Sequence, residues 1–197
     1  MSHRHATLCL SRCRLPARRL TDVVYDCVAA FSRRASSESS HLKSAQGDAR
    51  ETTQANGDNM TPEQIKIVQA TFNKIRPVAQ ETGELFYQKF FEMDPTVRPL
   101  FKGDIKRQGL MLMTAIGMAV SNLDRPETIA GNIEALGYRH WQYGVRPHDY
   151  NTFGAALMWT LEQVLGDDFT QEAREAWGET YALLSSSMKQ ATKPTAP

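Results

Sequence analysis

The stretch from Ala135 to Val145 reads Ala-Leu-Gly-Tyr-Arg-His-Trp-Gln-Tyr-Gly-Val, and it bears most directly on the fold. Its histidine, His140, follows Ile129, Ile133 and Leu136 at helical spacing, so the four residues form one stripe. A lone histidine on an apolar stripe is more often a hydrogen-bonded core residue than a metal ligand. Periodicity alone therefore leaves both interpretations open.

Helical periodicity extends on both sides of this stretch, over residues 60–197, without the sustained alternation that is typical of strands. Thr61-Pro62-Glu63-Gln64 supplies an N-cap, a proline at the first helical position and a capping-box glutamine. Asp94-Pro95 predicts a short helical turn that ends at Pro99. We predict an all-α fold with six helices, over about 61–76, 82–93, 104–122, 126–141, 147–165 and 170–191.

Composition limits the function classes. The chain has 197 residues, of which 41% are hydrophobic and 23% charged, with a formal net charge of +1, so nothing global points to nucleic acid. No apolar run approaches the ~20 residues that span a membrane. All three cysteines lie within the first 27 residues, so the remainder needs no disulfide. We therefore expect a cytoplasmic protein that is not bound to a membrane.

Residues 1–59 differ in composition from residues 60–197, and we place a boundary between them. The first segment is rich in arginine, and Ser36–Asn59 contains almost no large apolar residue, which predicts disorder. Val23–Phe31 could form one short amphipathic helix. Cys9 and Cys13 suggest zinc only weakly, because no second, well-spaced pair of ligands follows.

Three interpretations of residues 1–59 remain open. The segment could be an organelle transit peptide, since it is rich in Arg and Ser and poor in acids near its start. It could be a regulatory tail, in which Arg33-Arg34-Ala-Ser36 suits a basophilic kinase. It could also be translated only because the start codon was assigned too early. Met60 directly precedes a natural helix start, which favours this third interpretation.

A second stripe lies on the helix expected over 104–122, where Gln108, Leu112, Ala115 and Ala119 share one face. Gln108 is thus a polar group at the head of an apolar face. The two stripes could line opposite walls of one pocket, although a glutamine at the end of a stripe is usually a surface residue. A shift of one residue in this helix would replace Gln108 in the pocket by Arg107 or Met111.

The order of these features along the chain resembles the globin family, above all bacterial single-domain globins and the haem domain of flavohaemoglobins. The likeness covers essentially all of residues 60–197. It rests on Phe-Tyr at 86–87, Leu-Phe at 100–101 after an Asp-Pro turn, Gln108, and Leu-Gly-x-x-His-x-x-x-Gly-Val at 136–145. Val145-Arg-Pro-His-Asp-Tyr150 and Ala176-Trp-Gly-x-x-Tyr181 extend it.

The resemblance implies a globin fold around haem b, with His140 as the proximal ligand of the iron. The other ring nitrogen of His140 would donate to a backbone carbonyl, such as that of Leu136, which fixes the tautomer. Leu136 and Val145 would flank the haem on this side. Phe101 would pack against the haem face, although it could also be a plain core aromatic.

On the opposite, distal side the resemblance implies that Tyr87 and Gln108 donate hydrogen bonds to a dioxygen ligand. Such a ligand carries partial negative charge, and donors in a dry pocket stabilise it more than they would in water. Leu112 would form part of the apolar wall. Tyr87 could instead be a core residue whose hydroxyl reaches the surface.

Tyr150 matches a proximal tyrosine that flavohaemoglobins pair with a glutamate near the end of the last helix. Here the corresponding stretch, Met188-Lys-Gln-Ala-Thr192, contains no acid, and Glu179 lies too far up the helix. The chain therefore departs from the pattern associated with peroxidase-like chemistry. We expect His148, at a helix start, to be exposed and without a ligand role.

Three functions remain open at this stage. The first is a haem protein that binds O2 reversibly, with NO or CO as further ligands, for storage, transport or sensing. The second is a nitric oxide dioxygenase in which Tyr87 and Gln108 assist and a separate reductase supplies electrons, since no Gly-rich phosphate loop is present. The third is a haem-free helical interaction module. The sequence does not specify an oligomeric state.

Overall fold

The computed structural model of the chain describes residues 60–191, which form six α-helices and four short 3-10 helices without a strand. The predicted all-α fold is therefore confirmed. The α-helices are α2 (Pro62–Ile75), α3 (Ala79–Met93), α4 (Ile105–Val120), α5 (Ala130–Gln142), α6 (Pro147–Leu165) and α7 (Gln171–Gln190). The 3-10 helices are η1 (Arg76–Val78), η2 (Pro95–Leu100), η3 (Pro126–Thr128) and η4 (Gly166–Asp168).

Helix starts follow the local sequence. At α2 the capping box forms as predicted, since the Gln64 N–H donates to Thr61 Oγ1 at 3.2 Å and the Thr61 N–H donates to Gln64 Oε1 at 2.8 Å. At α7 the Thr170 hydroxyl accepts the Ala173 N–H at 3.3 Å. Pro147 opens α6 at the predicted residue. These devices satisfy backbone donors that have no partner within the helix.

Three boundaries differ from the prediction by two residues or more. The helix expected from residue 82 begins at Ala79, because η1 accommodates Pro77 in a tight turn and the helix resumes at once. The helix expected from residue 126 is interrupted after η3, so α5 begins at Ala130. The helix expected to reach residue 122 ends at Val120, where the Asn122 side chain donates to the Met118 carbonyl at 2.8 Å.

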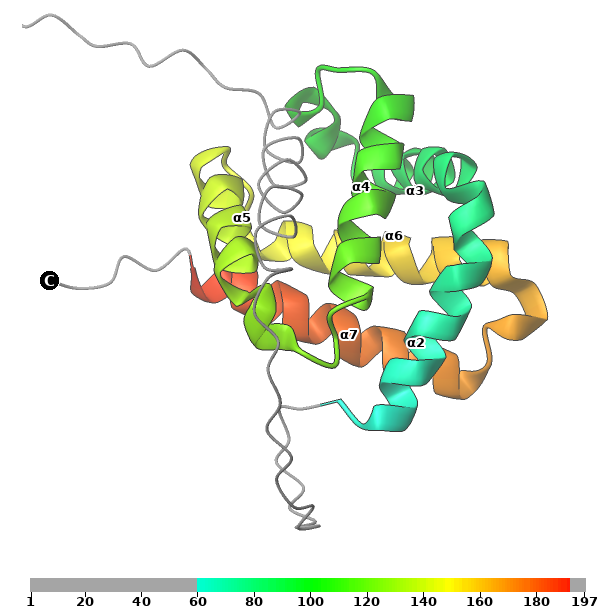
Figure 1. Ribbon diagram of the computed structural model, residues 1–197. Helices are drawn as coiled ribbons and strands as arrows, with labels where there is room; N and C mark the ends of the chain where they lie inside the picture. Colours follow the sequence, from blue (N-terminus) through cyan, green and yellow to red (C-terminus); the bar gives the residue numbers. More distant parts are fainter. Residues whose placement is uncertain (1–59, 192–197) are drawn as a thin grey trace, which may run out of the picture.

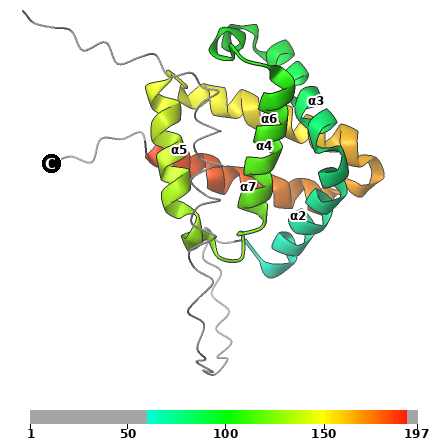
Figure 2. The same ribbon diagram turned by 45° about the horizontal axis from the view of Figure 1, so that its top comes forward.

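The helices cross one another in a three-dimensional arrangement rather than a parallel bundle. In both views α4 crosses in front of α6 and α7, with α5 on one side of it and α2 and α3 on the other (Figure 1, Figure 2). The most extensive helix pairs are α3 with α4, α5 with α7, α3 with α6 and α2 with α7. This crossing pattern keeps α4 and α5 apart and leaves room between them for a pocket.

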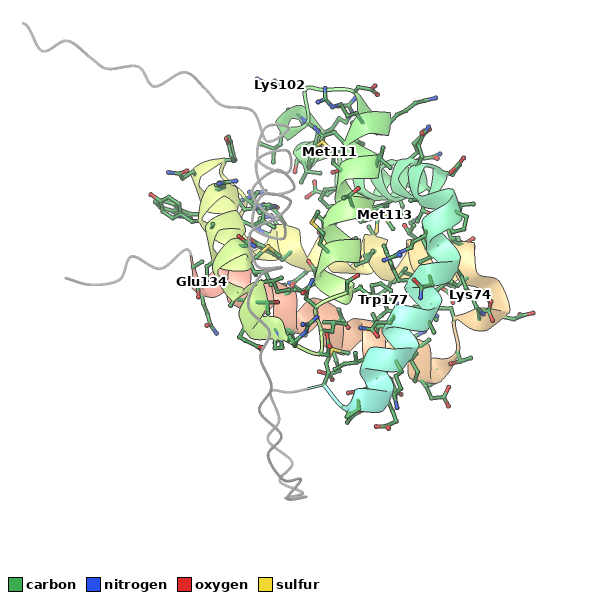
Figure 3. All side chains as sticks on the ribbon, viewed as in Figure 1. Lys74, Lys102, Met111, Met113, Glu134 and Trp177 are labelled. Carbon is green, nitrogen blue, oxygen red and sulfur yellow. The ribbon has the colours of Figure 1, made fainter. Side chains whose placement is uncertain are left out.

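Trp177 of α7, labelled in Figure 3, is the largest of the fully buried side chains among the described residues, at 1% exposed. Its indole Nε1–H donates to Thr71 Oγ1 of α2 at 3.0 Å, and its ring lies 6.3 Å from that of Phe72. The buried indole donor therefore has a partner, as a buried polar group requires. This contact ties α7 to α2.

Two close helix crossings depend on glycine. A Cβ at Gly83 of α3 would lie within 3 Å of the backbone of Gly109 of α4. A Cβ at Gly137 of α5 would lie within 3 Å of the backbone of Met188 of α7. Because any side chain would push these helices apart, the glycines fix how α3 meets α4 and how α5 meets α7.

Several predictions fall outside the described residues. These are the helix over Val23–Phe31, the weak zinc suggestion at Cys9 and Cys13, and the three interpretations of residues 1–59. Within residues 60–191, no helix is both long enough and apolar enough to cross a bilayer.

Candidate functional site

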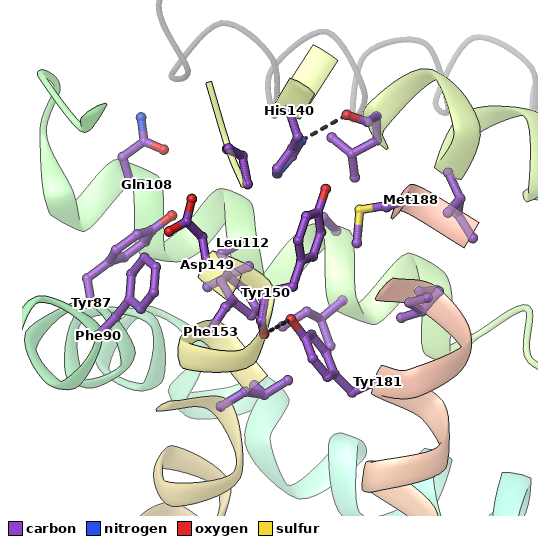
Figure 4. Close-up of a pocket in the computed structure, with 18 of the residues that line it drawn as sticks. Tyr87, Phe90, Gln108, Leu112, His140, Asp149, Tyr150, Phe153, Tyr181 and Met188 are labelled. Carbon is purple, nitrogen blue, oxygen red and sulfur yellow. Dashed lines mark hydrogen bonds between the residues drawn. The ribbon is translucent and has the colours of Figure 1, made fainter. Parts of the chain in front are cut away.

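A cavity opens between α4 and the α5–α6 corner, with about 210 Å³ of space for the centres of water-sized molecules. Its walls come from α3, η2, α4, α5, α6 and α7 and are mostly apolar (Figure 4). Every residue that the sequence singled out for the site borders this one cavity: Tyr87, Phe101, Gln108, Leu112, Leu136, His140, Val145 and Tyr150.

Both predicted stripes face the cavity. All four members of the α4 stripe, Gln108 to Ala119, line it. From the other stripe Ile133, Leu136 and His140 line it, whereas Ile129 is buried just before α5 begins. Neither Arg107 nor Met111 is among the lining residues, so α4 has the register that places Gln108 in the cavity.

His140 is held in one orientation by its own helix. Its Nδ1 lies 2.8 Å from the Leu136 carbonyl oxygen, one turn earlier (Figure 4). A carbonyl only accepts hydrogen bonds, so Nδ1 carries the proton and Nε2 keeps its lone pair. Burial lowers the pKa of His140, and the bond to Leu136 opposes this only in part. The neutral imidazole therefore offers Nε2 as a metal ligand.

The end of α5 is anchored to the same residue. The Val145 N–H donates to the His140 carbonyl at 3.0 Å across a turn in which Gly144 has a φ of 86°. A positive φ of this size favours glycine, which explains the Gly-Val exit in the sequence. The turn brings Val145 to the cavity beside His140.

Tyr87 and Gln108 form a polar end of the cavity, apart from His140 in the view of Figure 4. Each is 3% exposed, so the alternative in which the Tyr87 hydroxyl reaches the surface is wrong. The Tyr87 ring packs at 5.2 Å against both Phe86 and Phe101, and burial raises the pKa of its hydroxyl. Tyr87 is therefore a neutral phenol in apolar surroundings, able to donate a hydrogen bond to a ligand.

Tyr150 borders the cavity beside His140, with ring centroids 6.4 Å apart and planes 30° from parallel. The residue is 6% exposed, and burial, with a smaller effect of Asp149, raises the pKa of its hydroxyl to about 12. Its hydroxyl is buried and has no hydrogen-bond partner among residues 60–191. A buried hydroxyl without a partner costs free energy. A bound group that accepts a hydrogen bond from this atom would remove that cost.

Sequence reasoning missed several lining residues, namely Asp149, Phe153, Tyr181 and Met188. Asp149 is a buried carboxylate that accepts the Arg146 N–H at 2.7 Å and so caps α6. Its position three residues after the N-cap was the available signal. The Tyr181 hydroxyl donates to the Tyr150 carbonyl at 2.5 Å, a contact between helices that no local pattern reveals.

A charged cluster lies at the corner before α6, where ligand atoms of Asp94, His148 and Asp149 come within 4.8 Å of one another. The Arg146 guanidinium already lies 3.3 Å from Asp149 Oδ1, and His148 Nε2 lies 2.9 Å from the same atom. With this cation in place we interpret the cluster as an ion network rather than a metal site. The His148 side chain is 55% exposed, in line with the prediction.

The residues around the cavity fit a haem. A flat, largely apolar cofactor with a central iron needs apolar walls and one basic nitrogen on one side. The cavity has such walls, and His140 presents Nε2 with its tautomer fixed by the Leu136 carbonyl. Leu136 and Val145 lie on the same side as His140, whereas Leu112 lies with Gln108 on α4.

Comparison with known proteins gives a consistent result. Residues 84–188 match the family model described as Globin, which is more than half of the chain. The chain is 29% identical over 134 residues to the flavohemoprotein of Xylella fastidiosa, covering 66% of this chain and 34% of that protein. The flavohemoprotein of Vibrio cholerae is 26% identical over 129 residues (64% of this chain, 33% of that protein), and that of Bacillus subtilis 29% over 135 residues (65% and 32%).

The chain thus spans about a third of the length of the curated relatives that it matches. The match includes the residues of α3 to α7 that surround the cavity. The helical fold, the cavity and the family match together show that this chain belongs to the globin family of haem-binding proteins.

Proposed function

We propose that this globin holds haem b with His140 as its proximal ligand and binds dioxygen reversibly, for storage, transport or sensing. The observation that supports this most is His140, whose Nε2 is left available by the Nδ1 bond to Leu136 in an apolar cavity. Haem iron, when bound, supplies a coordination position for a diatomic ligand such as O2, NO or CO.

His140 contributes a neutral imidazole of fixed orientation. The Leu136 carbonyl holds the proton at Nδ1, which keeps the ring from rotating and makes Nε2 more basic. Because burial lowers the pKa of His140, protonation does not compete with metal binding near neutral pH. This residue therefore needs no carboxylate partner to act as a ligand.

Tyr87 and Gln108 contribute neutral donors at the other end of the cavity. Both are buried, and Leu112 and Phe101 border the same space with apolar surface that excludes water. A ligand with partial negative charge gains more from such donors than a nonpolar one does. The pair therefore favours dioxygen over carbon monoxide.

Nitric oxide dioxygenation, in which dioxygen converts nitric oxide to nitrate, is a second candidate. Its support is the same buried Tyr87 and Gln108 pair, together with relatives that are named flavohemoproteins. Sustained turnover would require electrons from a separate reductase. The binding function requires none.

The test of haem binding uses the full chain expressed with haem supplied. Spectra of the ferric, ferrous, dioxygen-exposed and carbon monoxide-exposed protein should show a Soret band that shifts with each ligand, and the pyridine haemochrome should be that of haem b. His140→Ala should lose the Soret band, whereas the matched control His148→Ala, which changes an exposed histidine of the same region, should keep it. A chain without a Soret band would instead be a haem-free helical interaction module.

Turnover separates the two candidate functions. Nitric oxide is added to the oxygenated protein in the presence of a generic reductase, and its consumption is followed with an electrode. A single stoichiometric burst supports the binding function. Sustained consumption that is lost in Tyr87→Phe supports the dioxygenase.

A further inference from the structure

We propose that Met188 is a site of reversible oxidation, where the sulfoxide formed by a peroxide accepts a hydrogen bond from the buried Tyr150 hydroxyl. The inference goes beyond the proposed function and does not require bound haem. It starts from the Tyr150 hydroxyl, which is buried in the cavity wall and has no hydrogen-bond partner among residues 60–191. Burial raises the pKa of Tyr150 to about 12, so the hydroxyl keeps its proton and is available as a donor.

Met188 lies on the face of α7 that meets Tyr150. Tyr181, Leu184 and Met188 follow one another at helical spacing, and all three line the cavity. The Tyr181 hydroxyl donates to the Tyr150 carbonyl, and the Lys189 Nζ lies 5.4 Å from the centre of the Tyr150 ring, so this end of α7 packs against Tyr150. In Figure 4 the Met188 side chain extends from α7 toward the Tyr150 hydroxyl.

The Met188 thioether is a poor partner for this hydroxyl. A thioether sulfur is only a weak acceptor, and no hydrogen bond joins it to Tyr150. Oxidation adds an oxygen atom that projects beyond the sulfur and makes the side chain polar. In walls as apolar as these, burial of a sulfoxide without a donor would be costly. The Tyr150 hydroxyl supplies that donor, and the sulfoxide oxygen supplies the acceptor that the hydroxyl lacks.

The sulfur is accessible to a small oxidant, because Met188 is only partly buried and borders the cavity. Hydrogen peroxide transfers one oxygen atom to Sδ: the O–O bond breaks and an S–O bond forms. The sulfur gives up two electrons, and the second oxygen leaves as water with both protons of the peroxide. A methionine sulfoxide reductase reverses the step, since two thiols become a disulfide and the oxygen leaves as water.

The oxidised residue would join the end of α7 to the first turn of α6, beside the candidate metal ligand. The Tyr150 ring lies 6.4 Å from the ring of His140, and Gly137 of the His140 helix touches the Met188 backbone. A new hydrogen bond at this point therefore stabilises the contact between α5, α6 and α7. Under the proposed function, the wall that holds the metal would respond to peroxide.

The first experiment treats the full chain, as purified, with hydrogen peroxide and locates the oxidised methionines by peptide mass spectrometry. Met188 should be oxidised in the folded protein and restored by a methionine sulfoxide reductase. Met93, which is 43% exposed and does not line the cavity, serves as the internal reference. Oxidation of Met93 while Met188 stays a thioether would show that the oxidant does not reach the site, and would overturn the proposal.

The second experiment tests the hydrogen bond by urea titration of full-chain variants with matched haem content. Met188→Gln supplies an amide oxygen in place of the sulfoxide, whereas Met188→Leu stays apolar. The ratio of their folding equilibrium constants should favour Met188→Gln about fivefold more with Tyr150 present than in the Tyr150→Phe background, the usual effect of one hydrogen bond. The control pair, Met93→Gln and Met93→Leu, should give ratios that agree within about twofold in the two backgrounds.

Equal ratios for the Met188 pair in the two backgrounds would mean that no bond forms between residue 188 and the Tyr150 hydroxyl, and the proposal would fall. Peroxide treatment of the wild type and of Met188→Leu gives the same comparison with the sulfoxide itself. The folding equilibrium constant of the wild type should then fall less on oxidation than that of the Tyr150→Phe variant does. Haem binding is read separately from the Soret band of the same samples, so the two proposals can fail independently.

Discussion

The two walls of the cavity carry different chemistry. The wall from α3 and α4 presents the neutral donors Tyr87 and Gln108 in apolar surroundings. The wall from α5, α6 and α7 presents the candidate metal ligand His140 and the buried hydroxyl of Tyr150, which has no hydrogen-bond partner among residues 60–191. Under the proposed function, the first wall would stabilise the ligand and the second would hold the metal.

Each wall is positioned by a glycine next to its key residue. Gly109 follows Gln108 and touches Gly83, so the α3–α4 crossing sets where Gln108 enters the cavity. Gly137 follows Leu136, whose carbonyl orients His140, and touches the backbone of Met188. Both walls thus combine a close backbone contact with the residue that carries the chemistry.

The largest expected effect is on the α5 wall. His140→Gly should abolish most Soret absorbance, because the cavity then offers no basic nitrogen at that position. Added imidazole should restore part of it by occupying the vacated space. Spectra of His140→Gly with and without imidazole test this, and His148→Gly serves as the control. Retention of the full band in His140→Gly would show that another residue binds the iron.

The glycine crossings should show the next largest effect, on stability. Gly83→Ala and Gly137→Ala should each lower the free energy of unfolding by about 2–3 kcal/mol, since a methyl group would overlap backbone atoms that cannot move away. Gly178→Ala, at a helical position with open space around it, should raise it by about 0.5–1 kcal/mol. Urea titration of the haem-free chain measures all three.

Equal effects at Gly83 and Gly178 would show that the α3–α4 contact is looser than described. If Gly83→Ala lowered the free energy of unfolding and Gly137→Ala did not, the α5–α7 contact would be the looser of the two, because α5 could then move away from α7 without cost. Haem affinity of the Gly137→Ala variant tests the same point, since movement of α5 also moves His140.

On the α3–α4 wall, Tyr87→Phe should speed dioxygen release about tenfold, since loss of one strong donor costs about 1–3 kcal/mol. Gln108→Leu should have a smaller effect, about threefold, because Tyr87 remains as a donor. Flash photolysis or stopped-flow mixing measures the rates. Tyr138→Phe, on a residue that is 49% exposed, is the control. Unchanged release from Tyr87→Phe would mean that its hydroxyl does not reach the ligand.

Much of this comparison could be predicted from the sequence, because helical periodicity and caps are local. The Gln108 and His140 stripes follow from spacing, and the residues of both that face the cavity could be named in advance. The starts of α2 and α7 follow from Thr61 and Thr170. The family resemblance supplied the proposed roles of Tyr87 and Tyr150, which spacing does not reveal.

Other features could not be predicted, because they arise where distant segments meet. Met188 lines the cavity only because α7 crosses α5 at Gly137. The start of α5 at Ala130 depends on a 3-10 turn that a proline permits but does not require.

The smallest expected effect concerns how the second wall is held together. Tyr181→Phe removes the hydroxyl that donates to the Tyr150 carbonyl at 2.5 Å and keeps the ring that stacks on Phe153 and fits against Gly154. We expect a loss of about 1 kcal/mol in the free energy of unfolding, the usual net value of one hydrogen bond. Urea titration measures it against Tyr138→Phe, and an unchanged value would mean that packing alone fixes the start of α6. Because the bond is to the backbone of Tyr150 and not to its hydroxyl, the Soret band of the haem-loaded chain should stay the same, which separates the stability of this wall from its proposed role in haem binding.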